Sequence, residues 1–325
     1  ETTISSSEDK AGQYQDVEFT FNSGDNTSGS VAFIKWTETN GNQDIINEEV
    51  WVDDVSVKAK NEATEDDNYE IVWADDFNKT QLDTSKWDYE LGSIRGVEQE
   101  HYVNDPENVY VKDGQLVLQV TNRDKEDQYK NPRGNRQVIY NSGSIRTHGK
   151  QEFLYGRIEM KAKLPKGKGA FPAFWTLGSD FTLDGRISSE QGAPWPVCGE
   201  IDIMEHRNAE TQVIGTLHWN PSTTNYEHVY AGSETTNSFG AIDTIENWHT
   251  YAIEWYEDCM KWYVDGICYQ TMNISSEQMD EFQRDHFIIL NLALGSNSSP
   301  FTLNQTVSAN FTNATMYVDY VRVYQ

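Results

Sequence analysis

Short segments that alternate hydrophobic and polar residues recur from residue 71 to the C-terminus. Side chains two residues apart share one face of a β-strand, so this alternation predicts strands with one buried face. Gly, Asp and Asn between the segments are typical of tight turns. The pattern therefore predicts an all-β fold, an antiparallel β-sandwich of the jelly-roll type with two large curved sheets. The segments include "NVYVKDGQLVLQVTN" (108–122), "YGRIEMKAKL" (155–164), "VIGTLHWN" (213–220), "WHTYAIEWYED" (248–258), "FIILNLALG" (287–295) and "MYVDYVRVYQ" (316–325).

Two other regions differ from this pattern. Residues 1–60 contain short alternating segments such as "VEFTFNSGDNTSGSVAFIKW" (17–36), and the polar, acidic stretch at 61–69 is typical of a linker. This predicts a small β segment at 1–60, a linker at 61–69 and one large domain at 70–325. Sixty residues with three or four strands cannot easily close a sandwich alone. Helical periodicity is weak except at "SSEQMDEFQRD" (275–285).

The charge balance restricts the partners. The 325 residues hold 52 acidic and 25 basic side chains, a formal net charge of −27. Such a chain repels nucleic acid and anionic membranes, so neither is an expected partner. Separately, we expect a monomer. No run of 18 apolar residues is present, and the first residues lack the features of a signal peptide. The three cysteines, Cys198, Cys259 and Cys268, are predicted to be free thiols.

The segment "GEIDIMEHRN" (199–208) places three carboxyl groups in a stretch that is otherwise apolar enough to be a buried strand. In a regular strand Glu200 and Asp202 share one face, while Ile201 and Ile203 point into a core. Glu205 has the wrong parity and would be buried with the isoleucines, where an unpaired carboxylate is costly. We therefore predict a β-bulge around residues 203 and 204, which would move Glu205 to the face of the other two acids.

With this bulge Glu200 and Glu205 are about four ladder steps apart, on the order of 13 Å between Cα atoms. Two long side chains that lean toward each other can bring their carboxyl groups to the ~5 Å that a retaining glycosidase needs. Repulsion among three acids on one face is expected to raise at least one pKa. One group could then act as an acid near neutral pH while another stays an ionised nucleophile.

Two simpler interpretations of the three acids remain open, a solvated strand face and a cation site. Aromatic residues on the neighbouring segments favour a third interpretation, which is a groove that binds a polysaccharide. Trp175 and Trp195 precede the acidic strand, and His218 and Trp219 follow it. Aromatic ring faces stack on sugar rings, so several of them beside acidic groups are typical of a polysaccharide groove.

These residues resemble glycoside hydrolase family 16, in its laminarinase-like branch. The family signature Glu-x-Asp-x-x-Glu is met by "EIDIME", and "YGRIEMKAKLPKGKGAFPAFWTLG", "WPVCGEIDIMEHRN" and "WHTYAIEWYEDCMKWYVDG" resemble the family in the same order. The resemblance covers about residues 70–325. It implies a jelly roll with an open cleft on its concave sheet and retaining endo-hydrolysis of β-1,3-glucan, and also of mixed-linkage β-1,3/1,4-glucan. Because the substrate is a polymer, we expect a secreted protein.

The resemblance also implies roles for individual residues. Glu200 would be the nucleophile, Glu205 the acid and base, and Asp202 a group that hydrogen-bonds the nucleophile. His218 would face the cleft near Glu205. Other positions that match glucan-contacting residues are Trp175, Trp195, Arg146, Asn291 and Glu98. For Arg146 a surface salt bridge, and for Asn291 a satisfied buried amide, are equally good interpretations.

No cofactor is expected for catalysis. The resemblance implies a structural Ca²⁺ on the convex side, with Asp319 as a ligand and backbone oxygens from near Asp76 and Gly114. Oxygen ligands of this kind suit a hard cation. Residues 1–60 resemble the C-terminal half of a family-4-type carbohydrate-binding module, although its first half is missing.

Departures from the family pattern keep the substrate open. "GVEQEHYV" (96–103) lacks an Asn that contacts sugar in relatives, and "FTLDGRISSEQGAPWP" (181–196) is an unusual loop. Two alternatives to a β-glucanase are therefore retained. One is a non-catalytic β-glycan-binding protein on the same fold. The other is a family 16 enzyme that acts on another β-glycan, such as a galactan.

Overall fold

The computed structural model describes residues 69–96, 98–132, 136–181, 193–208, 210–222, 225–235, 246–295 and 314–325. The chain divides into two units, Glu1–Glu65 and Asp66–Gln325, and only the second contains described residues. The expectations for residues 1–60 therefore lie outside the described residues, as does nearly all of the predicted linker. They stay predictions. No helix in the described ranges is long and apolar enough to cross a bilayer.

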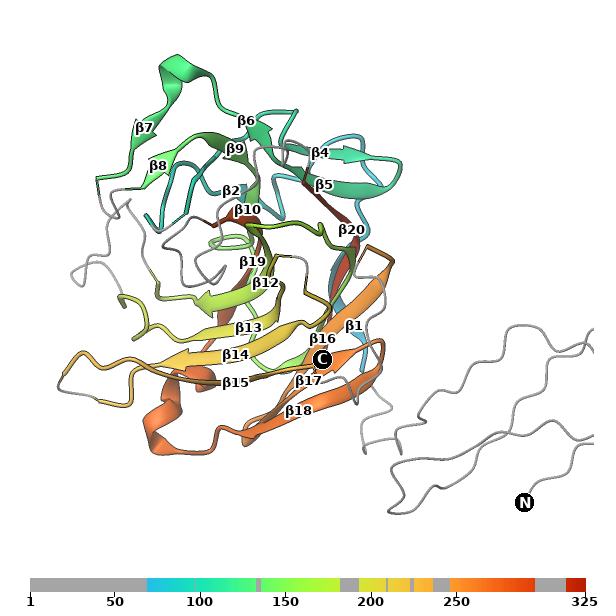
Figure 1. The fold of residues 1–325 in the computed structure, drawn as a ribbon. Helices are drawn as coiled ribbons and strands as arrows, with labels where there is room; N and C mark the ends of the chain where they lie inside the picture. The colour runs from blue at the N-terminus through green and yellow to red at the C-terminus, as the bar shows by residue number, and fades with distance from the viewer. Residues whose placement is uncertain are drawn as a thin grey trace, which may run out of the picture. The chain divides into compact units, whose positions relative to one another are not determined.

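Two large sheets dominate the described residues, as the sequence predicts (Figure 1). The first runs β18 (Ile267–Asn273), β17 (Cys259–Val264), β16 (His249–Trp255), β11 (Gly156–Lys163), β20 (Thr315–Tyr324), β5 (Gln115–Gln119) and β4 (Val109–Lys112), and β1 (Ile71–Asp75) also pairs with β20. The second runs β15 (Val229–Glu234), β14 (Ile214–Trp219), β13 (Glu200–Glu205), β12 (Ala170–Gly178), β19 (His286–Leu294), β10 (Ser144–Arg146) and β2 (Asp88–Tyr89). Their strands pair antiparallel throughout the described registers.

Smaller elements complete the described part of the chain. They are β3 (Glu100–Tyr102), β9 (Tyr140–Ser142) and β6 (Thr121–Asn122) in one small sheet, β7 (Tyr129–Lys130) and β8 (Gln137–Val138) in another, and the 3₁₀ helices η2 (Lys125–Asp127) and η4 (Glu277–Gln283). Strands β3 and β9 pair parallel, which departs from the antiparallel expectation. The predicted helical segment at 275–285 forms only η4, which is interrupted at Met279.

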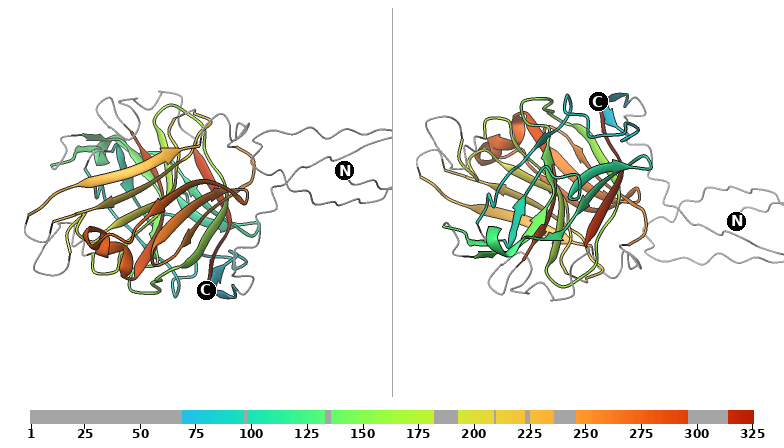
Figure 2. Two further views of the ribbon diagram at one scale, coloured as in Figure 1. Left: turned by 90° about the horizontal axis from the view of Figure 1, so that it is seen from below. Right: turned by 90° about the horizontal axis from the view of Figure 1, so that it is seen from above.

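The main core fills the space between the two large sheets, which Figure 2 shows as two layers. Strand β11 contributes alternate residues to it, and every second side chain from Gly156 to Ala162 is buried. From the second sheet Phe174, Ile201 and Leu217 point into the same core and are fully buried. Burial of large aliphatic and aromatic side chains contributes about 1.5–3 kcal/mol each, so this layer fixes which face of β12, β13 and β14 is left for chemistry.

The opposite face of the second sheet has a smaller apolar cluster of its own. Its members lie on β12, on β19 and in the segments beside them: Ala173, Trp175, Leu177, Phe181, Cys198, Phe287 and Ile289. All three cysteines are free, as predicted. The turn at Asp265 and Gly266 has two residues with positive φ, but a bulge in β18 places Cys259 opposite Asn273, one residue further from Cys268 than a regular ladder would.

Candidate active site

Strand β13 presents its three acids on one face. Its ladder with β12 places Glu200, Asp202 and Glu205 opposite alternate residues of that strand, Leu177, Trp175 and Ala173. Residues two apart on β12 share a face, so their partners do as well. The register shifts between Asp202 and Glu205 in the ladder with β14, which has one residue fewer than β13 over this stretch. The predicted bulge at residues 203 and 204 is therefore confirmed.

Two interactions with the opposite sheet support this bulge. Ile203 and Met204 are both buried in the main core, so the extra residue adds apolar contact. The carbonyl of Asp202 accepts a hydrogen bond of 2.8 Å from the indole N–H of Trp262 on β17. A buried carbonyl without a partner costs about 1–3 kcal/mol, so Trp262 stabilises the irregular ladder. Gly215 on β14 makes room for this indole, because a Cβ there would lie 2.4 Å from Trp262 Cδ1.

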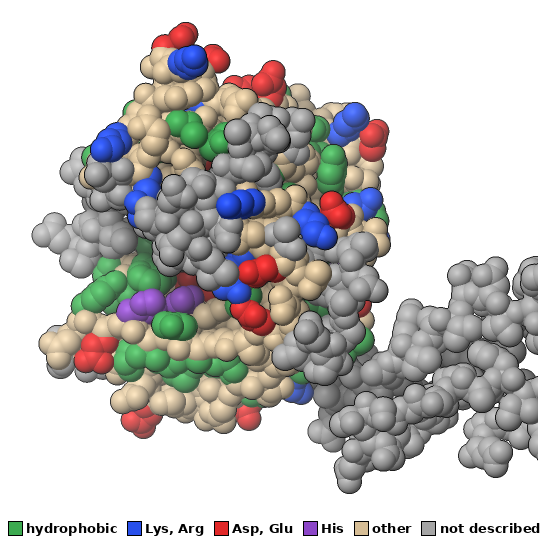
Figure 3. Space-filling model, viewed as in Figure 1, with side chains coloured by type: hydrophobic (Ala, Val, Ile, Leu, Met, Phe, Trp, Pro, Cys, Tyr) green, Lys and Arg blue, Asp and Glu red, His purple; other side chains and the backbone are tan. Residues whose placement is uncertain are grey.

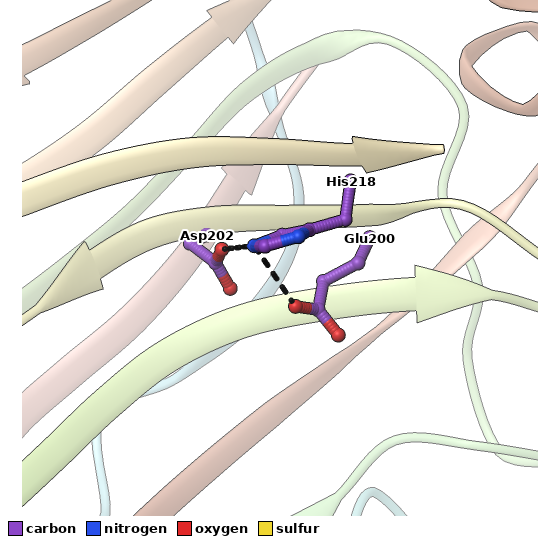
Figure 4. A group of neighbouring side chains, drawn as sticks. All are labelled: Glu200, Asp202 and His218. Carbon is purple, nitrogen blue, oxygen red and sulfur yellow. Dashed lines mark ion pairs between the residues drawn. The ribbon is translucent and has the colours of Figure 1, made fainter. Parts of the chain in front are cut away.

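His218 lies between the first two acids (Figure 4). Its Nε2 atom is 3.3 Å from Asp202 Oδ2 and 3.6 Å from Glu200 Oε1. The reason is the ladder, which places His218 on β14 directly opposite Glu200. Glu205 is paired with Ile214, four residues from His218 along β14, and the charge of His218 still lowers the pKa of Glu205.

Aromatic and imidazole rings surround Glu200 on its solvent side. Trp195 donates a hydrogen bond of 3.0 Å from Nε1 to Glu200 Oε2. His218 Nδ1 is 2.8 Å from Nε2 of His228, whose ring lies 4.5 Å from that of Trp195. The exposed ring of Tyr230 is stacked on His218 at 5.7 Å. Figure 3 shows histidine side chains in a recess of this face, with hydrophobic side chains along the neighbouring edge.

Burial controls the protonation of the three acids. It raises the pKa of Glu200 to about 8, with a further contribution from the negative charge of Asp202. Burial also raises the pKa of Asp202 and of Glu205 well above their ordinary values. The sequence predicts repulsion among the acids as the cause, but in the structure desolvation is the larger effect and repulsion the smaller one. The carboxyl group of Glu205 accepts no hydrogen bond within the described residues, whereas that of Glu200 does.

Trp175 occupies its predicted face but does not offer an open ring. Only 7% of it is exposed, and the guanidinium of Arg95 lies 4.8 Å from the ring centre. Arg95 is itself held by Glu90, with 3.0 Å between Nη2 and Oε2. The indole N–H of Trp175 donates to Asn291 Oδ1 at 2.7 Å, and Asn291 Nδ2 donates to the hydroxyl of Tyr102. Asn291 is therefore a satisfied buried amide, the second interpretation given above.

The other two predicted contact residues are Arg146 at the end of β10 and Glu98 just before β3. Arg146 on β10 is partly buried and 3.9 Å from Asp88, and its Nε has no hydrogen bond. Glu98 is buried beside Arg95, whose pKa its charge raises.

Two of the residues named for the calcium site have side chains that are paired with cations. Asp319 Oδ2 is 2.9 Å from Lys161 Nζ, and Asp76 Oδ1 is 2.7 Å from Arg322 Nη2. Gly114 lies in the turn between β4 and β5, where its φ is +73°. The Asp319 carboxylate as placed is therefore bound to a cation, whereas the backbone oxygens near Asp76 and Gly114 are not engaged by these ion pairs. The calcium site stays a prediction, and nothing below depends on it.

Comparison with known proteins identifies the family. A family model described as "Beta-porphyranase A-D, GH16 domain" matches residues 69–325. The chain belongs to glycoside hydrolase family 16. Among its family 16 relatives, glucan endo-1,3-β-glucosidase A1 of Niallia circulans is 36% identical over 280 residues, which are 78% of this chain and 38% of that relative.

Two solved structures agree with this fold. A LamA variant from Z. galactanivorans, in complex with laminaritriose and laminaritetraose, has a TM-score of 0.64 at 32% identity and covers 78% of this chain and 98% of its own. A second solved structure has a TM-score of 0.66 at 28% identity and covers 79% of this chain and 91% of its own. It comes from work on endo-acting O-glycanases with which human gut microbiota initiate mucin breakdown. The predicted jelly roll is therefore confirmed.

Sequence reasoning missed two residues of this family 16 site. His228 follows the expected strand "VIGTLHWN" by eight residues, and its pairing with His218 depends on the hairpin between β14 and β15. Arg95 directly precedes the stretch where the sequence departs from the family pattern, and this departure was the one sequence feature that could have drawn attention to Arg95. Its position over Trp175 depends on a contact between distant parts of the chain.

Proposed function

We propose that this chain is an endo-acting, retaining β-glucanase that hydrolyses β-1,3-glucan of the laminarin type and mixed-linkage β-1,3/1,4-glucan. The observation that carries the proposal is the shared face of Glu200, Asp202 and Glu205 on a bulged strand. The names of the relatives support the substrate class. Because the chain spans well under half of its first relative, the activity of the whole protein is part of the proposal.

Glu200 is the nucleophile in this proposal. Its carboxylate receives a hydrogen bond from Trp195, and the nearby imidazole of His218 lowers its pKa against the effect of burial. These groups oppose the effect of burial but leave the pKa of Glu200 at about 8, so the ionised form that must attack the anomeric carbon becomes more populated as the pH rises toward that value. The attack forms a covalent bond between Glu200 and the sugar while the glycosidic bond breaks.

Glu205 is the acid and then the base. It has no hydrogen-bond donor among the described residues, and burial raises its pKa and favours the protonated form. It gives its proton to the departing glycosidic oxygen and later takes one from the water that releases the sugar. The negative charge of Asp202, which lies between them in the strand, raises the pKa of both Glu200 and Glu205, and its Oδ2 atom is 3.3 Å from His218 Nε2.

The proposal needs no cofactor, because both proton transfers and the covalent step use side chains of this chain. A soluble or cell-wall polymer cannot be imported intact, so we also propose that the enzyme acts outside the cell.

The test is product analysis on a panel of laminarin, mixed-linkage β-glucan, lichenan, agarose and porphyran. Wild-type protein is expected to release a series of oligosaccharides from laminarin, and Glu200→Ala is expected to release none. A Glu200→Ala variant that still released reducing ends from laminarin would overturn the assignment. Binding of laminarin without products from any polymer would instead indicate the non-catalytic glycan-binding protein.

A galactan is the second candidate substrate. The matched family model is described by porphyranases, and one structural neighbour comes from work on mucin O-glycanases. The position of Arg95 over Trp175 supports this alternative, because it puts a cation where an open aromatic ring would stack on glucose. Products from porphyran or agarose, with none from laminarin, would favour the galactanase and leave the catalytic roles unchanged.

A further inference from the structure

Three ligand atoms converge at the centre of the site. Glu200 Oε1, Asp202 Oδ2 and His218 Nε2 all lie within 4.8 Å of one another, and they come from the adjacent strands β13 and β14. Figure 4 shows the imidazole edge directed at both carboxyl groups. When Nδ1 of His218 donates to His228, Nε2 carries a free lone pair, so three electron-pair donors face one another. Such an arrangement favours a cation between them.

The distances match a known coordination geometry. Zinc bonds of ~2.0–2.1 Å to nitrogen and oxygen, arranged as a tetrahedron, place neighbouring ligand atoms about 3.3 Å apart. The imidazole nitrogen is 3.3 Å from Asp202 Oδ2 and 3.6 Å from Glu200 Oε1. A small side-chain rotation that brings the two carboxyl oxygens together completes three corners.

The outer atoms of two of these ligands are already held. Trp195 donates to Oε2 of Glu200 and leaves Oε1 free, and His228 fixes the imidazole of His218 from its Nδ1 side. Support of this kind orients metal ligands and strengthens binding. Asp202 supplies an independent observation, because it is only 2% exposed and its Oδ2 atom has no hydrogen-bond partner among the described residues.

We propose that Glu200, Asp202 and His218 bind a divalent first-row transition ion of the zinc class. Imidazole with carboxylate suits Zn²⁺ or Cu²⁺ better than Ca²⁺ or Mg²⁺, which prefer oxygen alone. The ion occupies the position of the sugar carbon that Glu200 attacks and therefore inhibits the enzyme competitively. Only this inhibitory consequence rests on the proposed function, since the binding itself does not.

The test is titration of the full chain with ZnCl₂ near neutral pH, followed by calorimetry. Wild-type protein is expected to bind one equivalent at this site, with affinity lowered roughly tenfold or more by His218→Ala. Asp202→Asn, which is nearly isosteric, is expected to weaken binding similarly and serves if the first variant folds poorly. MgCl₂ is expected not to compete.

The controls separate this site from other zinc ligands on the chain. His249→Ala removes a histidine 2.7 Å from Asp265, an exposed pair of the same chemistry, and is expected to leave the affinity unchanged. The double variant Cys259→Ser/Cys268→Ser, which removes the two thiols that are not buried, is expected to do the same.

Two results would overturn the proposal. One is wild-type protein that binds no zinc, and the other is equal zinc affinity in wild type, His218→Ala and Asp202→Asn. Hydrolysis of laminarin without zinc binding would remove this inference and leave the proposed function intact. Zinc binding that depends on His218, in a protein inactive on every polymer, would support this inference and overturn the proposed function.

Discussion

Arg95 lies over the indole of Trp175 because Glu90 holds it there. Glu90 is almost fully buried and accepts hydrogen bonds from Arg95 at 3.0 Å and from Ser144 at 2.6 Å. This buried pair could not be predicted from the sequence, because nothing local identifies its partners. The three acids could be predicted, since parity along one strand is a local property. Their pKa values could not, because burial depends on the whole fold.

The Arg95–Glu90 pair gives a prediction for single residues. Arg95→Ala leaves the buried carboxylate of Glu90 without its cation and is expected to lower the free energy of unfolding by about 3 kcal/mol. The double variant Glu90→Gln/Arg95→Ala removes the unpaired charge and is expected to recover part of that loss. Urea unfolding of both variants and of Glu90→Gln checks this. Strictly additive losses would show that the two side chains do not interact.

At the scale of the element, the bulge in β13 is the feature on which the site depends. The sequence predicts it because a strict strand would bury Glu205 with Ile201. Its support from Trp262 in the opposite sheet was not predictable, since the sequence does not specify which strands face each other. The weak helical pattern at 275–285 was overestimated. Only the short, kinked 3₁₀ segment η4 forms there, capped by Ser276, whose side chain accepts from the N–H of Gln278.

The bulge gives a prediction for Trp262. In Trp262→Phe the carbonyl of Asp202 loses its donor, and the free energy of unfolding is expected to fall by about 2 kcal/mol. The ladder near Glu205 loosens, so kcat is expected to fall more than KM changes. Trp248→Phe is the matched control, because that indole lies under Lys161 and Lys163, away from β13. Equal kinetics in the two variants would show that Trp262 does not position the acids.

For the domain as a whole, two layers of strands place one sheet face in the core and leave the other for chemistry. Alternation along the chain predicts the layers, and the family resemblance predicts their order. Neither the alternation nor the resemblance predicts which polar side chains are buried inside the domain. His286 is one of these. It is 1% exposed, with Nδ1 2.9 Å from the hydroxyl of Thr176 and Nε2 3.1 Å from the carbonyl of Glu281.

The burial of His286 predicts how stability depends on pH. Desolvation lowers its pKa from 6.5 to about 3. Between these values the unfolded chain binds a proton that the folded protein does not, so the free energy of unfolding falls as pH decreases through this window. His286→Gln keeps a donor and an acceptor and is expected to reduce that slope. Urea unfolding across the window measures it, and parallel curves for the two proteins would contradict the assignment.

The central claim is that Glu200 and Glu205, brought to one face by the bulge, carry out a double displacement. The stereochemistry of the first product tests this most directly, because two inversions at the anomeric carbon give net retention. Proton NMR during the first minutes of laminari-oligosaccharide hydrolysis distinguishes the anomers before they equilibrate. We predict that the β-anomer appears first and the α-anomer follows only by mutarotation. Initial release of the α-anomer would contradict the account, because it requires a single inversion with a water molecule in the place assigned to Glu200.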